Sequence, residues 1–255
     1  TGILTFTYTS GVVTVGSSTI IFNSSTITSG TVGWNNVWFL SGNTVPSTLK
    51  TDMAVNGLHT LGYTTAGMYI NNDGTAKTIT ANSGITMSGS TSVVLGTANI
   101  KATGGTITGV STVQLRNNLE IAGNVTFANG VSFYYNTGTL LYTSGTVTTT
   151  NSTIVISGST TLNTNGITWN SITINSTSTI TLSSNLAWSG TFSITAGNTT
   201  FAGAGIMSGA SLTITTSSGI VTLNADITCT GLVTLGTASS GCTLSSSGGT
   251  RTVIT

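Results

Sequence analysis

The sequence predicts an all-β fold, a single-chain parallel β-helix (β-solenoid) with about three short strands in each coil of roughly 20 residues. Three observations lead to this prediction. Thr, Val and Ile, which favour strands, are abundant, whereas charged residues make up only 4% of the chain. Apolar residues open short strand-like runs at nearly constant intervals. Within these runs, apolar and polar residues alternate with the period of two that strands produce.

Composition also limits the function classes. The hydrophobic content of 38% is enough to bury a core. Five Lys and Arg against four Asp and Glu give a net charge of +1, which offers no field to attract phosphate backbones or lipid headgroups. We therefore expect no nucleic-acid partner. No apolar run reaches the roughly 18 residues of a membrane helix, so we expect no membrane insertion either.

The first segment along the chain, residues 1–30, contains the apolar runs LTF, VVTV and TIIF. Gly, Ser and Asn residues separate these runs and supply the turns between strands. The segment therefore predicts one or more N-terminal solenoid coils.

The second segment, residues 31–67, differs in composition and spacing. It holds two of the four tryptophans, the only proline, Pro46, and the only histidine, His59. We expect an irregular insertion or a lateral lobe here. Because the segment is irregular and aromatic, Trp34, Trp38 and His59 are its candidate contact residues.

The third segment, residues 68–255, is predicted to be the regular solenoid. Hydrophobic residues that open I-T-x or V-T-x runs recur at a nearly constant interval along it. These openers are Ile85, Ile107, Val125, Val147, Ile167, Leu186, Ile206 and Ile227. The unit that begins at Ile167 shows the pattern well, because it contains three apolar pairs with strand spacing. Three strands per coil is the simplest interpretation.

Two other folds compete with the solenoid. A β-sandwich also contains many short strands and turns, but it has no reason to repeat strand triplets at a fixed interval. An intertwined trimer with a shared core is a third alternative. The regular interval favours the single-chain solenoid over the sandwich, and the trimer is the less favoured third option.

The residues that enzymes use are scarce. The chain has four carboxylates, and they fall at unlike positions of the repeat, so a paired-carboxylate or calcium site is not expected. These residues are Asp52, Asp73, Glu120 and Asp226. His59 could be paired with a serine as base and nucleophile, but a single His in an irregular segment is usually a surface or packing residue. We predict no catalytic residue, no cofactor and no metal.

The chain has two cysteines, Cys229 and Cys242. The repeat places both inward in the last full coil, on its first and third strands. A disulfide there would secure a terminal coil and would indicate an oxidising compartment. Two buried free thiols fit the sequence about equally well.

Threonines flank several strand openers, as in the range 106–108, and resemble the flat T-x-T arrays of ice-binding solenoids. The pattern lapses at residues 186–188 and 206–208, which favours an ordinary strand surface. Trp34, Trp38 and the Tyr134–Tyr135 pair could stack on sugar rings if they face solvent. Trp169 and Trp188 are expected in the core.

The segment NGITWNSITINSTSTITLSSNLAWSGTFSITAG resembles the strand-repeat regions of large secreted bacterial adhesins and of phage tail-fibre and other virion structural proteins. The resemblance covers the chain from about Ile85 onward, and residues before it match less well. It implies a rigid spacer or attachment surface and transfers no functional residue.

We therefore expect a non-enzymatic structural protein, a virion component such as a phage fibre, spike or capsid-decorating protein. A fragment of a bacterial adhesin or an extracellular filament subunit is the alternative. A glycan-processing tailspike and an ice-binding solenoid rank lower. Expected partners are further copies of the chain, other virion or surface proteins, and cell-surface glycans. The expected location is the virion or the cell exterior.

Overall fold

The structure is a computed structural model. It describes residues 4–23, 25–40, 46–61, 68–87, 93–109, 113–115, 118–216, 219–236, 243–246, 249 and 251–255. In this part of the chain, every regular element is a β-strand. The predicted fold class is confirmed, because parallel strands stack into a β-solenoid of about 10 turns with coils of about 21 residues.

The chain divides into two compact units, which are described separately. The first comprises Thr1–Val131 and Thr143–Thr148, and the second comprises Ser132–Tyr142 and Thr149–Thr255. The boundaries expected from the sequence lie after residues 30 and 67, because they follow changes in composition. The two units are instead separated by the pattern of contacts along the chain.

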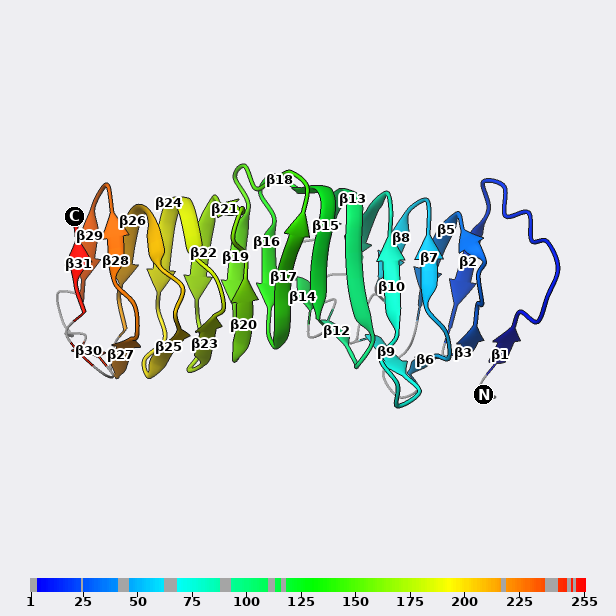
Figure 1. The fold of residues 1–255 in the computed structure, drawn as a ribbon, viewed down its shortest axis with the longest axis horizontal. Coiled ribbons are helices and arrows are strands. Elements are labelled where there is room, and N and C mark those ends of the chain that lie inside the picture. Colours follow the sequence, from blue (N-terminus) through cyan, green and yellow to red (C-terminus); the bar gives the residue numbers. More distant parts are fainter. Residues whose placement is uncertain are drawn as a thin grey trace. The chain divides into compact units, whose positions relative to one another are not determined.

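The first unit contains two parallel sheets, each named here after its first strand (Figure 1). The β1 sheet has the spatial order β1 (Leu4–Thr7), β3 (Ser25–Thr28), β6 (Ser47–Leu49), β9 (Met68–Asn72), β12 (Val93–Leu95) and β14 (Val113–Leu115). The β2 sheet has the order β2 (Thr19–Phe22), β5 (Asn36–Phe39), β8 (His59–Leu61), β11 (Gly84–Met87), β13 (Asn99–Gly109) and β15 (Leu119–Phe127). Four shorter strands extend it: β4 (Gly33–Trp34), β7 (Met53–Val55), β10 (Thr78–Ala81) and β18 (Val147–Thr148).

The second unit repeats this arrangement. Its β16 sheet has the order β16 (Ser132–Tyr135), β19 (Thr153–Ile156), β22 (Ser171–Ile174), β24 (Leu186–Ile194), β26 (Met207–Ile214), β28 (Ile227–Cys229) and β31 (Val253–Ile254). In the same sheet, β21 (Thr168–Trp169) pairs with β24 and β29 (Val233–Leu235) pairs with β26. The β17 sheet has the order β17 (Gly138–Ser144, of which residues 138–142 belong to this unit), β20 (Thr160–Asn163), β23 (Thr179–Leu182), β25 (Thr199–Gly203), β27 (Ile220–Leu223) and β30 (Thr243–Ser246).

Register stacks the apolar residues of successive coils into inward columns. One column of the β16 sheet contains Phe133, Ile154, Ile172, Phe192 and Leu212, all buried. A parallel column contains Tyr135, Ile156, Ile174, Ile194 and Ile214, also buried. Since neighbouring strands lie about 4.8 Å apart, side chains of successive coils touch and the core is continuous within the unit.

The predicted insertion at residues 31–67 differs in the structure. Its described residues, 31–40 and 46–61, form strands β4 to β8, which pair in parallel with neighbouring coils. Val37, His59 and Ile85 occupy one inward column of the β2 sheet. This part of the segment therefore continues the solenoid and does not form a lobe. This continuation was not predicted from the sequence, because a histidine occupies an inward position that is apolar in neighbouring coils and because the coil length varies.

The predicted openers also need two corrections. Ile206 is 55% exposed, whereas its neighbour Met207 is buried and pairs with Leu186. Ile107 pairs with Phe127 and not with Val125. At Ile206, a shift of one residue moves the side chain to the other face of the sheet, so an apolar residue next to the true inward position misleads. Val125 is itself buried but pairs with Gly105, so β15 has two inward apolar residues that could pair with Ile107.

Candidate functional site: turns, hydroxyl columns and an outward tryptophan

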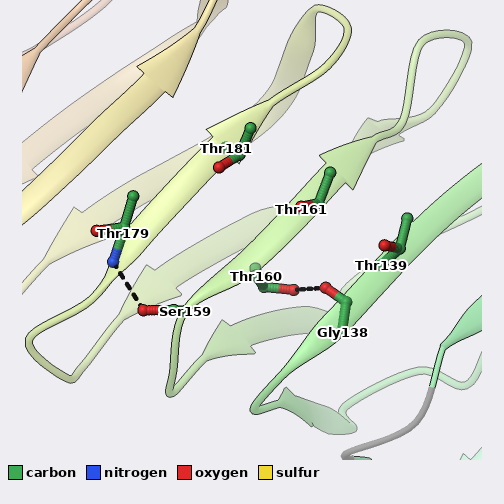
Figure 2. A pocket seen from close by; sticks show the side chains of 7 residues that line it. All are labelled: Gly138, Thr139, Ser159, Thr160, Thr161, Thr179 and Thr181. Carbon is green, nitrogen blue, oxygen red and sulfur yellow. Dashed lines mark hydrogen bonds between the residues drawn. The ribbon is translucent and has the colours of Figure 1, made fainter.

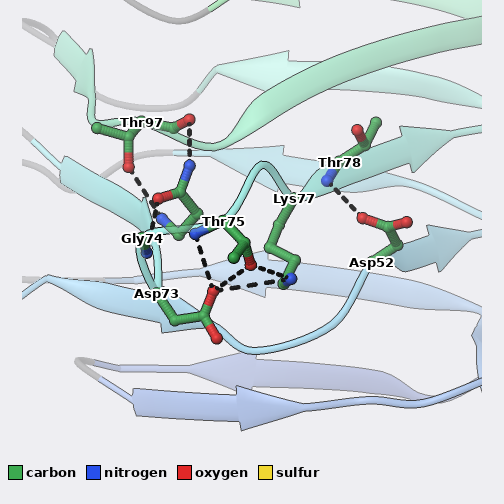
Figure 3. Close-up of polar contacts among 8 residues, drawn as sticks. Asp52, Asp73, Gly74, Thr75, Lys77, Thr78 and Thr97 are labelled. Carbon is green, nitrogen blue, oxygen red and sulfur yellow. Dashed lines mark hydrogen bonds and ion pairs between the residues drawn. The ribbon is translucent and has the colours of Figure 1, made fainter.

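Two of the four carboxylates lie in turns of the first unit. Asp52 Oδ1 accepts a hydrogen bond from the backbone N–H of Thr78 at 2.8 Å, as Figure 3 shows. Asp73 Oδ1 accepts from the Thr75 hydroxyl at 2.8 Å and lies 3.7 Å from Lys77 Nζ. The Thr75 hydroxyl lowers the pKa of the Asp73 carboxyl. Asp52 therefore holds the backbone of the next coil, whereas Asp73 stabilises its own turn.

The other two carboxylates also have structural partners. Glu120 Oε1 lies 3.0 Å from Lys101 Nζ and accepts from the Thr143 hydroxyl at 2.9 Å. Lys101 and Glu120 are register partners on β13 and β15, so the ion pair joins successive coils. Asp226 Oδ1 accepts from the backbone N–H of Thr252 at 2.8 Å.

Asp52 and Asp226 exemplify a recurring contact, in which a side-chain Oδ1 at a turn accepts the backbone N–H of the next coil. Asparagines do the same at four other positions, two between strands and two within β5 and β15, with distances of 2.8 to 3.3 Å. The pairs are Asn36 with Leu58, Asn124 with Thr146, Asn185 with Ile206, and Asn198 with Ile220. Each bond satisfies a backbone donor that the strand ladder leaves unpaired.

His59 is fully buried, with no exposed surface. Neither of its ring nitrogens has a hydrogen-bond partner among the described residues, and its ring lies against Phe39 with centroids 5.6 Å apart. Desolvation by burial lowers the pKa of His59 to about 3. The histidine predicted for an exposed contact lobe is therefore a neutral core residue.

Hydroxyl side chains form columns on the outside of the β17 sheet. Thr139, Thr161 and Thr181 are register partners on β17, β20 and β23. Figure 2 shows them along a shallow hollow with Ser159 and Thr179. The Thr179 N–H donates to Ser159 Oγ at 3.1 Å, so part of the hydroxyl surface is used within the protein.

Similar columns occur elsewhere. In the β16 sheet, Thr173, Ser193, Thr213 and Thr234 follow one another. In the β2 sheet, one column holds Thr60, Thr86 and Thr108, and another holds Thr106, Thr126 and Thr148. The columns are interrupted where Ala187 stands between Thr168 and Ser208, and where Ala202 follows Thr181.

The structure separates the aromatic candidates. Trp34 is buried and packs edge-on against Phe6 and Phe22, and Tyr135 is fully buried. Trp169 and Trp188 are buried, as the sequence predicts. Trp38 and Tyr134 lie on the outward side of β5 and β16 and are partly exposed.

Trp38 lines an open hollow together with Thr19, Asn36, Leu58 and Thr60. The sequence identified Trp38 as a candidate contact residue but gave no indication of the other four residues that line the hollow. The signal that could have found Thr60 is its distance from Trp38 along the chain, which is close to the length of one coil.

Cys229 lies buried at the end of β28, as expected for an inward position, and burial raises the pKa of its thiol. Cys242 lies outside the described residues, so the disulfide and the pair of free thiols stay alternative predictions.

Among the described residues, no three His, Cys, Asp or Glu side chains gather as a metal site would require. The same residues contain no helix long and apolar enough to cross a membrane. Comparison of the chain with protein families, characterised proteins and solved structures finds no match.

Proposed function

We propose that this chain is a non-enzymatic structural protein, a rigid shaft or attachment surface of a virion such as a phage fibre, spike or capsid-decorating protein. The observation that carries the proposal is that the carboxylates and the histidine all have structural roles. The four carboxylates each bind a turn or a neighbouring coil, and the one histidine is a neutral core residue.

The outward surface supports the same proposal. Its columns present Thr and Ser hydroxyls, and net charge is only +1. Such a surface carries few groups whose ionisation changes with pH or whose interactions are screened by salt. This suits a particle or fibre exposed to a changing environment. Paired strands also leave few backbone groups open to proteases.

The same observations also support the alternative of an adhesin fragment or an extracellular filament subunit. Immunogold electron microscopy of the native source material separates the two. The virion proposal expects label at regular positions on a capsid, tail or fibre. Label along cell-attached fibres would contradict it and would favour the adhesin or filament.

Ice binding is a second candidate that one observation favours. Thr179, Thr200 and Thr222 are register partners beside the column of Thr139, Thr161 and Thr181, so two hydroxyl columns run next to each other. Ala202 interrupts the column that contains Thr181. An ice-recrystallisation assay tests this candidate. Ice crystals that grow as large with the protein as without it would exclude ice binding.

A further inference from the structure

We propose that the hollow around Trp38, on strands β2, β5 and β8, binds the ring of a neutral sugar. The inference rests on the proposal that the chain is an attachment surface, and it names the class of ligand that this surface would hold.

The position of Trp38 follows from strand alternation. Its neighbours Val37 and Phe39 are fully buried, so Trp38 lies on the outward side of β5. The other three tryptophans of the chain are buried. The register partners of Trp38 are Ile21, which is 51% exposed, and Thr60. The indole therefore lies at an outward, partly exposed position between two smaller register partners.

The hollow combines an apolar floor with polar groups. Leu58 is 43% exposed and adds apolar surface beside the indole. Thr19 and Thr60 contribute hydroxyls, and Asn36 contributes an amide whose Oδ1 accepts from the Leu58 N–H at 2.8 Å. That bond fixes the orientation of the amide. The volume is about 410 Å³, within the roughly 300–1,000 Å³ that small-ligand sites occupy.

Charge decides which ligand class fits. None of the five described residues that line the hollow carries an ionisable group. A nucleic acid or acidic glycan would need cations to neutralise its charge, and none of these side chains supplies one. A neutral sugar ring presents weakly positive C–H groups to the negative face of an indole, while its hydroxyls exchange hydrogen bonds with Thr and Asn side chains.

The test is calorimetric titration of the whole chain with neutral hexaoses of glucose, mannose, galactose and N-acetylglucosamine, up to about 10 mM. We expect saturable binding of at least one hexaose. Trp38→Ala should weaken it by about tenfold or more, as loss of one stacked ring does elsewhere. Thr213→Ala, an outward exchange in the second unit, is the matched control and should bind as the parent chain does.

A second variant guards against a change of fold in Trp38→Ala. Thr60→Lys keeps the indole but places a long charged side chain at its register partner, and it should also abolish binding. Because Trp38 is the partly exposed tryptophan, its fluorescence in the parent chain should change on titration. Binding of no neutral hexaose, or equal binding by Trp38→Ala, would overturn the inference.

The result is independent of the microscopy. A chain found on virions that binds no neutral sugar would remove the Trp38 site and leave the structural role in place. A chain that binds sugar but labels cell-attached fibres would keep the site and overturn the virion assignment.

Discussion

At the residue scale, several positions of the inward columns depart from a simple apolar pattern, and two of them bear directly on stability. His59 replaces an aliphatic residue between Val37 and Ile85. Gly209 follows Trp188 in a column that continues to Cys229. Each departure has a measurable consequence for stability.

His59→Leu should stabilise the protein. The exchange removes two buried nitrogens that have no partner among the described residues, each of which costs about 1–3 kcal/mol, and keeps a similar volume in the column. The gain should show as a higher urea midpoint at pH 7.5, where the histidine is neutral in the folded chain and mostly neutral in the unfolded chain.

The same variant should alter the pH dependence of stability. Burial lowers the pKa of folded His59 to about 3, whereas the unfolded chain has the ordinary value of 6.5. Between these values the unfolded chain binds the extra proton, so parent stability falls with decreasing pH by about 1.4 kcal/mol per unit. His59→Leu lacks this loss, and its advantage should grow by about 2 kcal/mol from pH 6.5 to pH 4.5. A constant advantage would contradict the buried neutral histidine.

Gly209→Ala should destabilise the protein by about 2 kcal/mol or more. A Cβ at Gly209 would overlap the ring of Trp188, which is buried and whose Nε1–H donates to Ser211 O at 2.9 Å. The control is the double variant Gly209→Ala with Trp188→Leu. If the indole is the cause, the alanine should cost much less in the Trp188→Leu background than in the parent, as judged by urea unfolding.

At the element scale, the turns between strands depend on Asn and Asp side chains that reach the next coil. Asn185 and Asn198 make equivalent bonds, to the N–H groups of Ile206 and Ile220. They differ in backbone conformation, because Asn198 has a φ of 56°. Asparagine tolerates this left-handed conformation better than other residues with a side chain.

Asn185→Ala and Asn198→Ala should therefore differ in cost. The first loses one hydrogen bond, worth about 1 kcal/mol, and the second also forces alanine into the left-handed region at roughly 1 kcal/mol more. Asn198→Gly loses the bond but fits the backbone, so it should be less harmful than Asn198→Ala. Thermal unfolding of the three variants checks the order, and equal losses at the two sites would contradict the account.

The elements were predictable to different degrees. The alternation around Ile172 and Ile174 identifies a strand directly, because both residues are inward and buried. Near Ile206, however, Met207 is equally apolar, and only pairing with Leu186 decides which of them faces inward. The sequence around His59 predicts a lobe wrongly, because a buried histidine in an apolar column has no sequence signature.

At the scale of the whole molecule, low charge is the dominant feature. The described residues contain two ion pairs, Lys77 with Asp73 and Lys101 with Glu120. Stability within each unit therefore comes mainly from apolar columns and strand ladders, whose strength depends little on ionic screening.

Thermal stability should accordingly vary little with sodium chloride. Between about 20 mM and 0.5 M salt, we expect the free energy of unfolding to change by less than about 1 kcal/mol, the range of one or two exposed pairs. Differential scanning calorimetry at several salt concentrations checks this, with Glu120→Gln as a control that lacks one pair. A strong salt dependence would show that charges outside these pairs matter.

The candidate site was only partly accessible from the sequence. Trp38 could be named because tryptophan is rare in this chain, but Trp34 has a similar local context and is buried. Register decides between them, since Trp38 stacks outward beside Thr60 and Trp34 packs against Phe6 and Phe22. Register in turn depends on coil length, which changes from one coil to the next and which local patterning does not define.

The single-chain parallel register is the central claim, and paired cysteines test it most directly. Thr173 and Ser193 are outward register partners on β22 and β24, whereas Thr213 lies one coil further on β26. In a chain with both native cysteines replaced by alanine, we would oxidise Thr173→Cys with Ser193→Cys and, as the control, Thr173→Cys with Thr213→Cys. Adjacent strands bring Cα atoms within the roughly 4.4–6.8 Å of a disulfide, and two coils, at about 9.6 Å, do not. The account predicts an intrachain disulfide in the first variant alone, and disulfides between chains, or none in the first variant, would contradict it.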